Sequence, residues 1–279
     1  NYYENSHFNF TNLYMWREPF HVQIVEEEDV LYVTSSWKGK LAALQPFCVP
    51  ARYAEATQKL LAYFEEVGQP FHIYDMERDY ADFLRSCNCA EFDVVADRDN
   101  YDYVYLSEKL ISLSGRKLHS KKNHLNAFHK EHPDAVYQPI TDEIVTQCKL
   151  ELNSWYKQHK QEDGTVDPFI NYERTAILEV LNNFTDFRLQ GGAILLNGRV
   201  IAFTFGEQLN KDTAVIHVEK ADPEVRGAYP AINQGFVEHA WGHLTYINRE
   251  EDMGIEGLRK AKESYKPEKL IEKFNATLK

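Results

Sequence analysis

The chain has 279 residues, of which 43% are hydrophobic and 13% aromatic, a composition that supports a packed core and excludes a largely disordered protein. Its formal net charge of −12 argues against a protein whose main role is to coat nucleic acid, although it leaves room for a local basic groove. No apolar run approaches the ~20 residues that cross a bilayer, and the first residues do not resemble a signal peptide, so we expect a cytoplasmic protein.

The first half of the chain is predicted to alternate short strands with helices. Residues 21–37 alternate in two runs around an acidic turn, which is typical of a β-hairpin. Residues 50–66 carry apolar side chains at helical spacing behind Pro50. The other expected elements are strands over 40–47, 71–76, 91–96 and 101–106, a helix over 77–87 and a basic helix within 115–130.

The second half shows a similar order of elements. Asn197-Gly198 lies between two apolar runs and suits a type I′ turn, so residues 187–209 form the clearest predicted hairpin. The other expected elements are helices over 140–159, 171–184, 230–243 and 254–265, and strands over 213–221, 244–248 and 269–278.

The shared order of hairpin, strand, helix, strand, helix and strand predicts an α+β fold with a mixed sheet flanked by helices, present twice. The same order is the layout of GNAT-type acyltransferases, the acyl-CoA N-acyltransferases. We therefore expect an N-terminal GNAT-like domain over 1–136 and a C-terminal GNAT-like domain over 137–279.

The four cysteines do not suggest a structural or metal role. They are too few and too irregular for a disulfide framework, and Cys87-Asn88-Cys89 lacks the spacing of a zinc site. His119, His124 and His129 follow five-residue steps, which do not place ligands on one helical face. We expect reduced thiols and no bound metal.

Several segments resemble one narrower family. They are "GRKLHSKKNHLNAFHKEHP", "GGAILLNGRVIAFTFGEQL", "AVIHVEKADPEVRGAYPAINQGF" and "YINREEDMGIEGLRKAKESYKP". These segments resemble the family that forms the catalytic C-terminal part of phosphatidylglycerol lysyltransferases, and the resemblance covers most of the chain. It implies a tandem GNAT fold related to the Fem-type, aminoacyl-tRNA-dependent peptidyltransferases.

The loop between the predicted strand 213–221 and helix 230–243 is the first candidate site. In the GNAT superfamily this junction wraps the donor pyrophosphate with backbone N–H groups, and a helix N-terminus favours the negative charge. The loop departs from the usual signature, because Glu224 stands in place of Gln or Arg and Tyr229 in place of Gly or Ala. An ordinary connecting loop is the alternative. The expected donor-binding residues are Val218, Lys220, Arg226, Gly227 and Ala228.

The matching junction in the first half, residues 47–52, contains no glycine. The N-terminal domain is therefore expected to lack a donor site and to be structural or to shape the acceptor side.

A basic segment is the second candidate. Arg116, Lys117, Lys121, Lys122 and Lys130 gather before the first acidic residue, Glu131. Such a patch in an acidic protein suits a phosphate group of CoA, tRNA or a lipid headgroup, and we assign Lys121 and Lys122 to the donor. A basic helical face that only contacts water is the alternative.

The turn and helix over 246–265 are the third candidate. Glu251 or Asp252 could receive a cationic amino group, and Gly254 and Gly257 would let a ligand lie against the first helical turn. The alternative is that Asp252 simply caps the helix. The expected substrate-binding residues are Asn248, Arg249, Glu251, Asp252, Gly254 and Arg259.

Acyl transfer also needs a group that accepts a proton and one that assists the leaving group. His217 and Glu219 alternate with Val218, which would place both on one face of the sheet as candidate bases. A buried structural role is the alternative for His217. Tyr229 is the candidate acid.

We therefore expect a GNAT-type acyltransferase that moves an acyl group from acyl-CoA to an amine on a small molecule or lipid headgroup. Two alternatives stay open: an aminoacyltransferase that uses aminoacyl-tRNA, and a catalytically silent ligand-binding protein with the same fold. The sequence sets neither the acyl group nor the oligomeric state.

Overall fold

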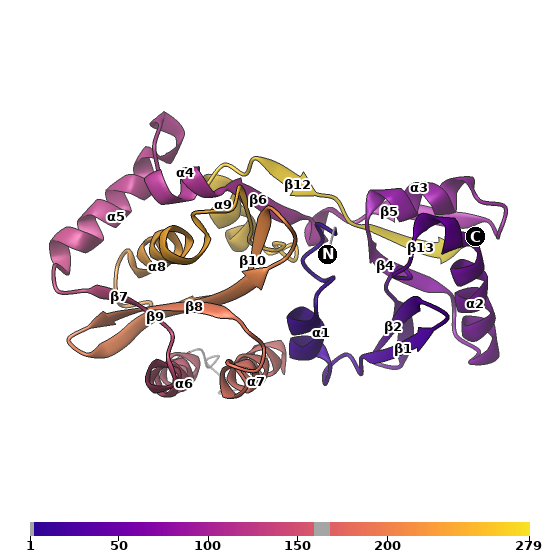
Figure 1. Cartoon of the computed structure of the whole chain (residues 1–279), viewed down its shortest axis with the longest axis horizontal. Helices are drawn as coiled ribbons and strands as arrows, with labels where there is room; N and C mark the ends of the chain where they lie inside the picture. Colours follow the sequence, from indigo (N-terminus) through magenta and orange to yellow (C-terminus); the bar gives the residue numbers. More distant parts are fainter. Residues whose placement is uncertain (1–2, 159–167) are drawn as a thin grey trace. The chain divides into compact units, whose positions relative to one another are not determined.

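The computed structural model describes residues 3–158 and 168–279, and its chain divides into two compact units (Figure 1). Unit 1 comprises Asn1–Met15, Tyr103–Glu250 and Glu256–Leu270. Unit 2 comprises Trp16–Asp102, Glu251–Ile255 and Ile271–Lys279. Each unit therefore combines segments that are far apart in the sequence.

Unit 1 is built on a mixed sheet with the strand order β12-β6-β11-β10-β9-β8-β7 among the described residues. Only β10 and β11 pair in parallel among the registered pairs. Its strands are β6 (Asp102–Leu106), β7 (Val136–Pro139), β8 (Gln190–Leu196), β9 (Arg199–Gln208), β10 (Thr213–Ala221), β11 (Tyr246–Asn248) and β12 (Lys269–Ile271). Its helices are α1 (Phe10–Trp16), α4 (Ser107–Ser112), α5 (His119–Glu131), α6 (Asp142–Gln158), α7 (Pro168–Asn182), α8 (Ala228–Phe236) and α9 (Glu256–Ser264).

Helices cover both faces of the unit 1 sheet, with α8 on one face and α6 and α7 on the other (Figure 1). This explains why β9 is buried almost continuously rather than at alternate residues. Phe203 of β9 stacks on Trp155 of α6 with ring centroids 5.9 Å apart. The hairpin turn between β8 and β9 has positive φ angles at Asn197 (53°) and Gly198 (79°), as its sequence predicted.

Unit 2 contains a second mixed sheet with the order β1-β2-β3-β4-β13-β5 among the described residues. Its strands are β1 (Gln23–Glu27), β2 (Val30–Trp37), β3 (Lys40–Ala43), β4 (His72–Met76), β5 (Phe92–Ala96) and β13 (Phe274–Leu278). Its helices are α2 (Tyr53–Glu66) and α3 (Arg78–Ser86). Leu60 and Phe64 of α2 and Tyr80 of α3 belong to the buried core of this unit.

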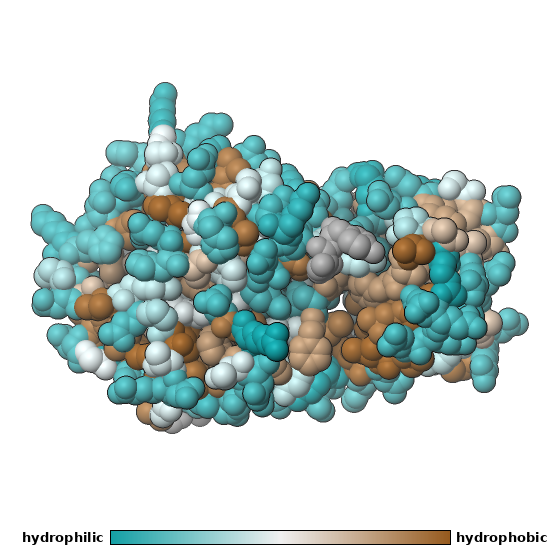
Figure 2. All heavy atoms as spheres, in the orientation of Figure 1, coloured by the Kyte–Doolittle hydropathy of each residue, from teal (hydrophilic) through white to brown (hydrophobic). Residues whose placement is uncertain are grey.

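The outer strand of unit 2 carries an apolar surface. Figure 2 shows hydrophobic side chains near the β1–β2 hairpin, where Ile24 is 49% and Val25 57% exposed. Lys59 of α2 forms ion pairs with Glu27 and Glu28 at the end of this hairpin. Charged residues on an edge strand discourage pairing with another chain.

The predicted α+β fold with two mixed sheets flanked by helices is confirmed. Some element bounds differ from prediction. The strand expected over 269–278 is two strands, β12 and β13, and α9 begins at Glu256 rather than Gly254. His159, expected to end a helix, lies outside the described residues.

The expected boundary between residues 136 and 137 does not coincide with the division into compact units, because it falls inside unit 1. Strand β6 comes from the first half of the chain and lies in the unit 1 sheet, between β12 and β11. Strand β13 comes from the end of the chain and lies in the unit 2 sheet, between β4 and β5. Element order alone does not specify such exchanges, since a strand's periodicity says nothing about its partner.

Candidate functional site

In unit 1 the parallel strands β10 and β11 pair at one end and then diverge. Strand β10 pairs with β11 only over Thr213–Val215, and β11 ends at Asn248. Strand β10 continues to Ala221, still paired with β9. The carboxyl ends of parallel strands are where open α/β sheets bind ligands, so this strand divergence is a candidate ligand site.

A β-bulge in β10 decides which side chains face the divergence. The register with β9 shifts between Ile216 and Val218, which makes His217 the extra residue. Glu219 bonds to Asn233 of α8, on the α8 face of the sheet. His217 instead bonds to Glu207. Glu207 shares the opposite face of the sheet with Phe205 and Phe203, which lie two and four residues before it on β9. The expectation that His217 and Glu219 share a face is therefore wrong, because the bulge breaks the alternation.

Glu219 and Arg249 form the centre of the site. Arg249 follows β11, and its Nη2 donates to Oε1 of Glu219 at 3.0 Å. Nδ2 of Asn233 donates to the other carboxylate oxygen at 2.8 Å. The guanidinium lies 5.6 Å from the ring centroid of Tyr105 and 4.8 Å from that of Tyr265. We call Glu219, Asn233, Arg249, Tyr105 and Tyr265 the carboxylate–guanidinium site.

Burial sets the electrostatics of these residues. Burial lowers the pKa of Arg249, but the Glu219 carboxylate outweighs it, and the pKa lies above its usual value. Burial raises the pKa of Tyr265 to about 12, so its hydroxyl stays protonated at neutral pH. Arg249 is thus a permanent cation within a sparsely hydrated site.

Two polar atoms of the site lack a hydrogen-bond partner among the described residues. They are Nη1 of Arg249, a donor, and Oδ1 of Asn233, an acceptor, and both are buried. Leaving buried polar groups unpaired costs about 1–3 kcal/mol each, so such atoms call for an explanation. An unpaired donor and acceptor around one carboxylate suit a polar ligand group, such as a carbonyl beside an N–H or O–H.

The turn that carries Arg249 is tied down by several elements. Asn248 accepts from the backbone N–H of Glu250 (2.8 Å) and donates to the carbonyl of Glu4 (3.1 Å). The Lys262 ammonium on α9 donates to the carbonyls of Arg249 and Glu250. The backbone N–H of Arg249 donates to the carbonyl of Tyr103 at 2.9 Å. Arg249 is therefore held in place before any ligand arrives.

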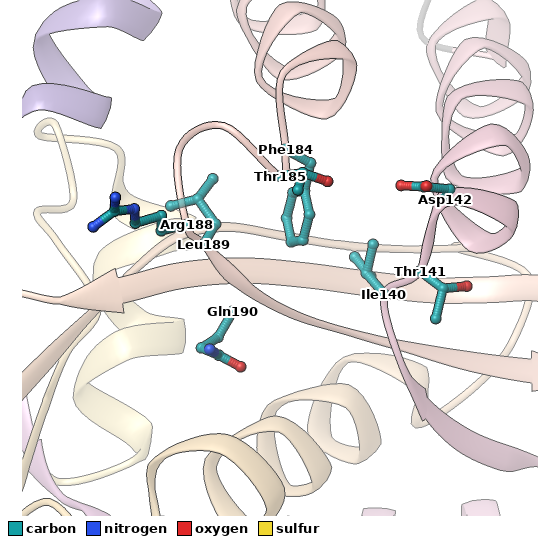
Figure 3. A pocket seen from close by; sticks show the side chains of 8 residues that line it. All are labelled: Ile140, Thr141, Asp142, Phe184, Thr185, Arg188, Leu189 and Gln190. Atoms are coloured by element: carbon teal, nitrogen blue, oxygen red, sulfur yellow. The ribbon is translucent and has the colours of Figure 1, made fainter.

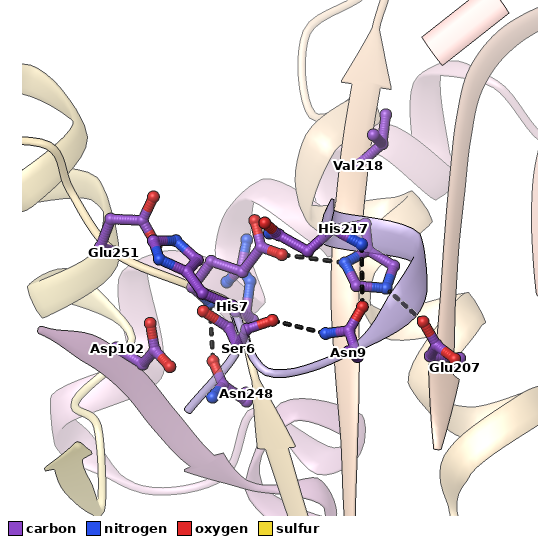
Figure 4. Close-up of polar contacts among 12 residues, drawn as sticks. Ser6, His7, Asn9, Asp102, Glu207, His217, Val218, Asn248 and Glu251 are labelled. Atoms are coloured by element: carbon purple, nitrogen blue, oxygen red, sulfur yellow. Dashed lines mark hydrogen bonds and ion pairs between the residues drawn. The ribbon is translucent and has the colours of Figure 1, made fainter. Parts of the chain in front are cut away.

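His217 is clamped between two carboxylates on the other face (Figure 4). Its Nδ1 lies 2.9 Å from Oε1 of Glu250 and its Nε2 lies 3.0 Å from Oε1 of Glu207. Burial lowers the pKa of this imidazole, but the two carboxylates raise it more, to about 9. His217 is then protonated at neutral pH with both nitrogens engaged, which suits a structural cation better than a base.

The loop before α8 is closed by its own hydrogen bonds. The side-chain carboxylate of Asp222 accepts from the backbone N–H of Glu224 at 3.0 Å. The backbone carbonyl of Asp222 accepts from the N–H of Val225 at 3.1 Å. The N–H of Ala228 donates to the carbonyl of Val225 at 3.2 Å. Asp222 is fixed in turn by Arg199 at 2.8 Å. Three of the N–H groups that could surround a pyrophosphate are thus already engaged.

Helix α5 packs directly on this loop. Gly227 has φ of 84°, and a Cβ there would lie 2.9 Å from Cβ of Phe128 and 3.0 Å from the carbonyl oxygen of His124. Arg226 is exposed, and Tyr229 is 46% exposed on the first turn of α8. The glycine is therefore explained by close packing of α5, without a ligand.

The three lysines predicted to bind the donor contact different parts of unit 1. Lys121 of α5 lies 4.5 Å over the ring of Tyr265, at the carboxylate–guanidinium site, and burial together with Arg249 lowers its pKa. Lys122 instead donates to the carbonyl of Ser112 at 3.0 Å. Lys220 points to the opposite face, where it donates to Glu173 of α7 at 2.8 Å.

The remaining predicted substrate residues belong elsewhere. Glu251, Asp252 and Gly254 are part of unit 2, whereas Arg259 lies on α9 of unit 1. Asp252 is fully buried, accepts from Arg98 at 3.3 Å, and accepts from the N–H of Gly254 at 2.9 Å. It therefore holds its own turn, which precedes the start of α9 at Glu256.

The glycines of this segment have separate explanations. Gly254 has φ of 71°, and a Cβ there would lie 2.8 Å from Oδ2 of Asp99. Gly257, in the first turn of α9, has open space around the position of a Cβ. Of these two glycines, only Gly254 has a backbone conformation that favours glycine over other residues.

Sequence reasoning missed several partners. Asn233, Tyr105, Tyr265 and Lys262 complete the site, and their roles depend on contacts between distant segments. In unit 2 it missed Lys273, which is fully buried and 2.7 Å from Asp102. The pattern of the predicted strand 269–278 gave no signal for this burial, because Lys273 follows Glu272 and lysine is rarely buried without a partner.

A separate pocket of about 480 Å³ opens between the start of α6 and the loop before β8 (Figure 3). Figure 3 shows Arg188 and Asp142 at opposite ends of its lining, with the ring of Phe184 between them. No residue of the carboxylate–guanidinium site and no predicted site residue lines it.

Within the described ranges, none of the helices combines the length and apolar character needed to cross a membrane. No group of three or more histidine, cysteine and acidic side chains there is arranged to hold a metal ion.

Known proteins resemble this chain over nearly its whole length. A conserved protein of unknown function from Bacteroides thetaiotaomicron is 34% identical, with 99% of this chain and 92% of that chain covered and a TM-score of 0.91. L-PGS from Bacillus licheniformis is 15% identical over 92% of this chain and 84% of that chain, with a TM-score of 0.64, so it shares the fold.

An uncharacterized protein of Mycoplasmoides gallisepticum is 26% identical over 216 residues, which are 74% of this chain and 67% of that protein. The family model described as "Phosphatidylglycerol lysyltransferase, C-terminal" matches residues 2–277. The chain therefore belongs to the phosphatidylglycerol lysyltransferase C-terminal family.

Proposed function

We propose that this chain is an aminoacyltransferase that moves an aminoacyl group from aminoacyl-tRNA to a nucleophile on a lipid headgroup. Family membership and the fold shared with L-PGS support a GNAT-like acyltransferase. The observation that carries the choice of donor is the Glu219–Arg249 pair at the strand divergence, beside a loop in which three backbone N–H groups are engaged.

This donor replaces acyl-CoA, the one favoured by sequence alone. A CoA pyrophosphate needs free backbone N–H groups at the start of the helix that follows the strand. Here the N–H groups of Glu224, Val225 and Ala228 have partners within the loop, and α5 packs on Gly227. An ester of tRNA does not require a pyrophosphate cradle, because its leaving group is a ribose oxygen.

The chemistry assigns a role to each charged group. The acceptor oxygen attacks the aminoacyl carbonyl, a new C–O ester bond forms, and the bond to the tRNA ribose breaks. Nη1 of Arg249, unpaired among the described residues, stabilises negative charge on the carbonyl oxygen. Glu219 accepts the proton of the acceptor hydroxyl, which then passes to the departing ribose oxygen. Water exclusion by Tyr105 and Tyr265 strengthens both interactions.

Conservative variants of the two charged residues test this assignment. Glu219→Gln keeps the shape but cannot accept a proton, and Arg249→Lys keeps the charge but loses the fork geometry. We expect each to lower the rate of transfer from lysyl-tRNA to phosphatidylglycerol vesicles by about 100-fold or more, as single groups of this kind contribute. Lys211→Glu, at an exposed loop residue of the same unit, is the control and should leave the rate unchanged.

Three results would contradict the proposal. Transfer from acetyl-CoA with none from charged tRNA would restore the acyl-CoA donor. Transfer that survives both variants would remove the carboxylate–guanidinium site from the chemistry. Binding of CoA or tRNA without any transfer would indicate the silent ligand-binding protein.

A further inference from the structure

The pocket between the start of α6 and the loop before β8 has the size and lining of a small-molecule site. Its volume of about 480 Å³ falls within the range of about 300–1,000 Å³ that is usual for ligand pockets. Three of its lining residues are apolar, Ile140, Phe184 and Leu189, and two carry opposite charges, Asp142 and Arg188. An apolar surface with a few polar groups at its margin is typical of a site for a small organic molecule.

The apolar part of the pocket is set by a glycine on β8. A Cβ at Gly191 would lie 2.7 Å from Cζ of Phe184 and 2.8 Å from Cδ1 of Ile140, so these two side chains pack directly on the strand backbone. Both remain partly exposed, whereas the neighbouring Leu189 is only 7% exposed. The ring of Phe184 and the side chain of Ile140 therefore form a preorganised apolar surface.

Two opposite charges lie at the ends of this surface and do not neutralise each other. Asp142 and Arg188 are separated by the ring of Phe184 (Figure 3). Both residues are exposed, and within residues 3–158 and 168–279 neither side chain forms an ion pair or a hydrogen bond. A carboxylate and a guanidinium are thus both available to a molecule that crosses the pocket.

Arg188 has a backbone conformation that is unfavourable for arginine. Its φ is 55°, in the left-handed region that glycine and asparagine occupy more readily. Its N–H donates to the carbonyl of Thr185 at 3.2 Å, which closes the turn after α7. The ring of Phe187 is anchored edge-on against Tyr14 and Phe10 of α1, with centroids 4.7 and 5.5 Å away. A strained residue that its neighbours hold in place points to a function, and here the strained turn brings a cation to the pocket.

The order of these groups selects the chemistry of a ligand. A carboxylate suits Arg188, whose guanidinium can donate two parallel N–H bonds to it. A primary ammonium suits Asp142 and can also contact the face of the Phe184 ring. Several carbon atoms must separate the two charges, because the ring lies between their partners. Glycine, with a single carbon between its charges, can satisfy only one end.

We infer that this pocket binds a small ω-amino carboxylate, a molecule with an ammonium and a carboxylate at opposite ends of a short hydrocarbon chain. The carboxylate contacts Arg188, the ammonium contacts Asp142, and the hydrocarbon lies on Phe184. The residues that line this pocket and those of the carboxylate–guanidinium site are different, so this is a second site of unit 1. The inference goes beyond the proposed function and does not depend on it.

A comparison of four small molecules tests the separation of the charges. We expect 6-aminohexanoate to bind with a Kd of about 1 mM or tighter, as a ligand of this size can, measured by titration with NMR detection. Glycine, hexanoate and hexylamine should each bind about tenfold more weakly or worse, because each can satisfy one end only. Equal affinity for all four molecules would overturn the inference.

Exchanging the two charges of the pocket gives a sharper test. Arg188→Glu alone and Asp142→Lys alone should each weaken binding of 6-aminohexanoate about tenfold or more, because each leaves two like charges for a ligand with opposite ones. The double variant, Arg188→Glu with Asp142→Lys, should bind within about threefold of the parent, since the ligand can lie in the reverse direction and the two changes compensate. Its net charge equals that of the parent, so the recovery cannot come from total charge.

A variant of the other site is the matched control. Glu219→Gln, in the carboxylate–guanidinium site, should bind 6-aminohexanoate like the parent. Loss of binding in this variant, with binding intact in both single charge variants, would place the ligand at the other site and overturn the inference. A folded double variant that fails to recover binding would also overturn it, and circular dichroism with thermal midpoints checks the folding of each variant. Absence of transfer from any donor would contradict the proposed function and leave binding at this pocket unchanged.

Discussion

At the scale of single residues, charges in unit 1 are held by several partners at once. Arg249 has a carboxylate, two aromatic rings and a backbone tied by Lys262, and His217 has two carboxylates. Of the central residues, Glu219, Arg249 and Lys121 could be picked from the sequence as polar groups near predicted strand and helix ends. Asn233 and Tyr105 could not, since a helix or strand pattern does not reveal which distant residue its side chain meets.

The clamp on His217 makes a prediction about stability. Its folded pKa of about 9 lies above the value of about 6.5 for an unfolded histidine, so the folded state binds the proton more tightly. The stabilisation is fully present below pH 6.5, declines as pH rises, and is lost above about 9. A shift of this size corresponds to roughly 3 kcal/mol. Urea unfolding from pH 6 to 9.5 should show this decline in the parent protein.

Two variants isolate the contribution of His217. His217→Gln should unfold at lower urea and lose much of the decline between pH 6.5 and 9.5. His243→Gln, at an exposed histidine of the same unit, should behave like the parent. A parent protein whose stability rises over this interval would show that His217 is neutral in the folded state.

At the scale of elements, the helices and strands with a clear local sequence pattern were predicted best. The β8–β9 hairpin followed from Asn197-Gly198, and the amphipathic helices α2 and α6 followed from their spacing. The bulge at His217 was not predicted, because an inserted residue leaves the apolar pattern of β10 almost unchanged. The break between β12 and β13 was also missed. Lys273 lies in this break, and its acidic partners, Asp102 and Glu251, are distant in sequence.

The packing of α5 on the loop before α8 predicts unequal effects for two glycine substitutions. Gly227→Ala combines a φ of 84° with a contact of 2.9 Å to Cβ of Phe128, which cannot move without shifting α5. Gly198→Ala has a φ of 79° but meets nothing within 4 Å. We expect Gly198→Ala to cost about 1 kcal/mol and Gly227→Ala at least 1 kcal/mol more, from denaturant unfolding. Equal costs would mean that α5 does not press on the loop.

At the scale of the whole molecule, each sheet contains a strand from the other half of the chain. Strand β6 of the first half lies inside the unit 1 sheet, and β13 of the second half lies inside the unit 2 sheet. The tandem order of elements was visible in the sequence, but the exchange was not, because partner choice depends on the assembled fold. Residues 1–136 and 137–279 therefore each lack an interior strand of the unit they mostly form.

This exchange predicts how fragments behave. Fragments 1–136 and 137–279 should each fail to give a cooperative unfolding transition when purified alone, since removing an interior strand leaves its neighbours unpaired. Mixing them after joint refolding should restore a cooperative transition. Cooperative folding of either fragment alone would show that it forms a self-contained domain.

The most direct measurement of the central claim is a crystal structure of the chain with a non-hydrolysable aminoacyl-adenosine, in which an amide replaces the ester of the donor. The account predicts that the aminoacyl carbonyl oxygen accepts a hydrogen bond from Nη1 of Arg249, with the adjoining amide near Glu219 and Asn233. A ligand bound away from Arg249, or a parallel CoA complex with its pyrophosphate seated on residues 222–228, would contradict it.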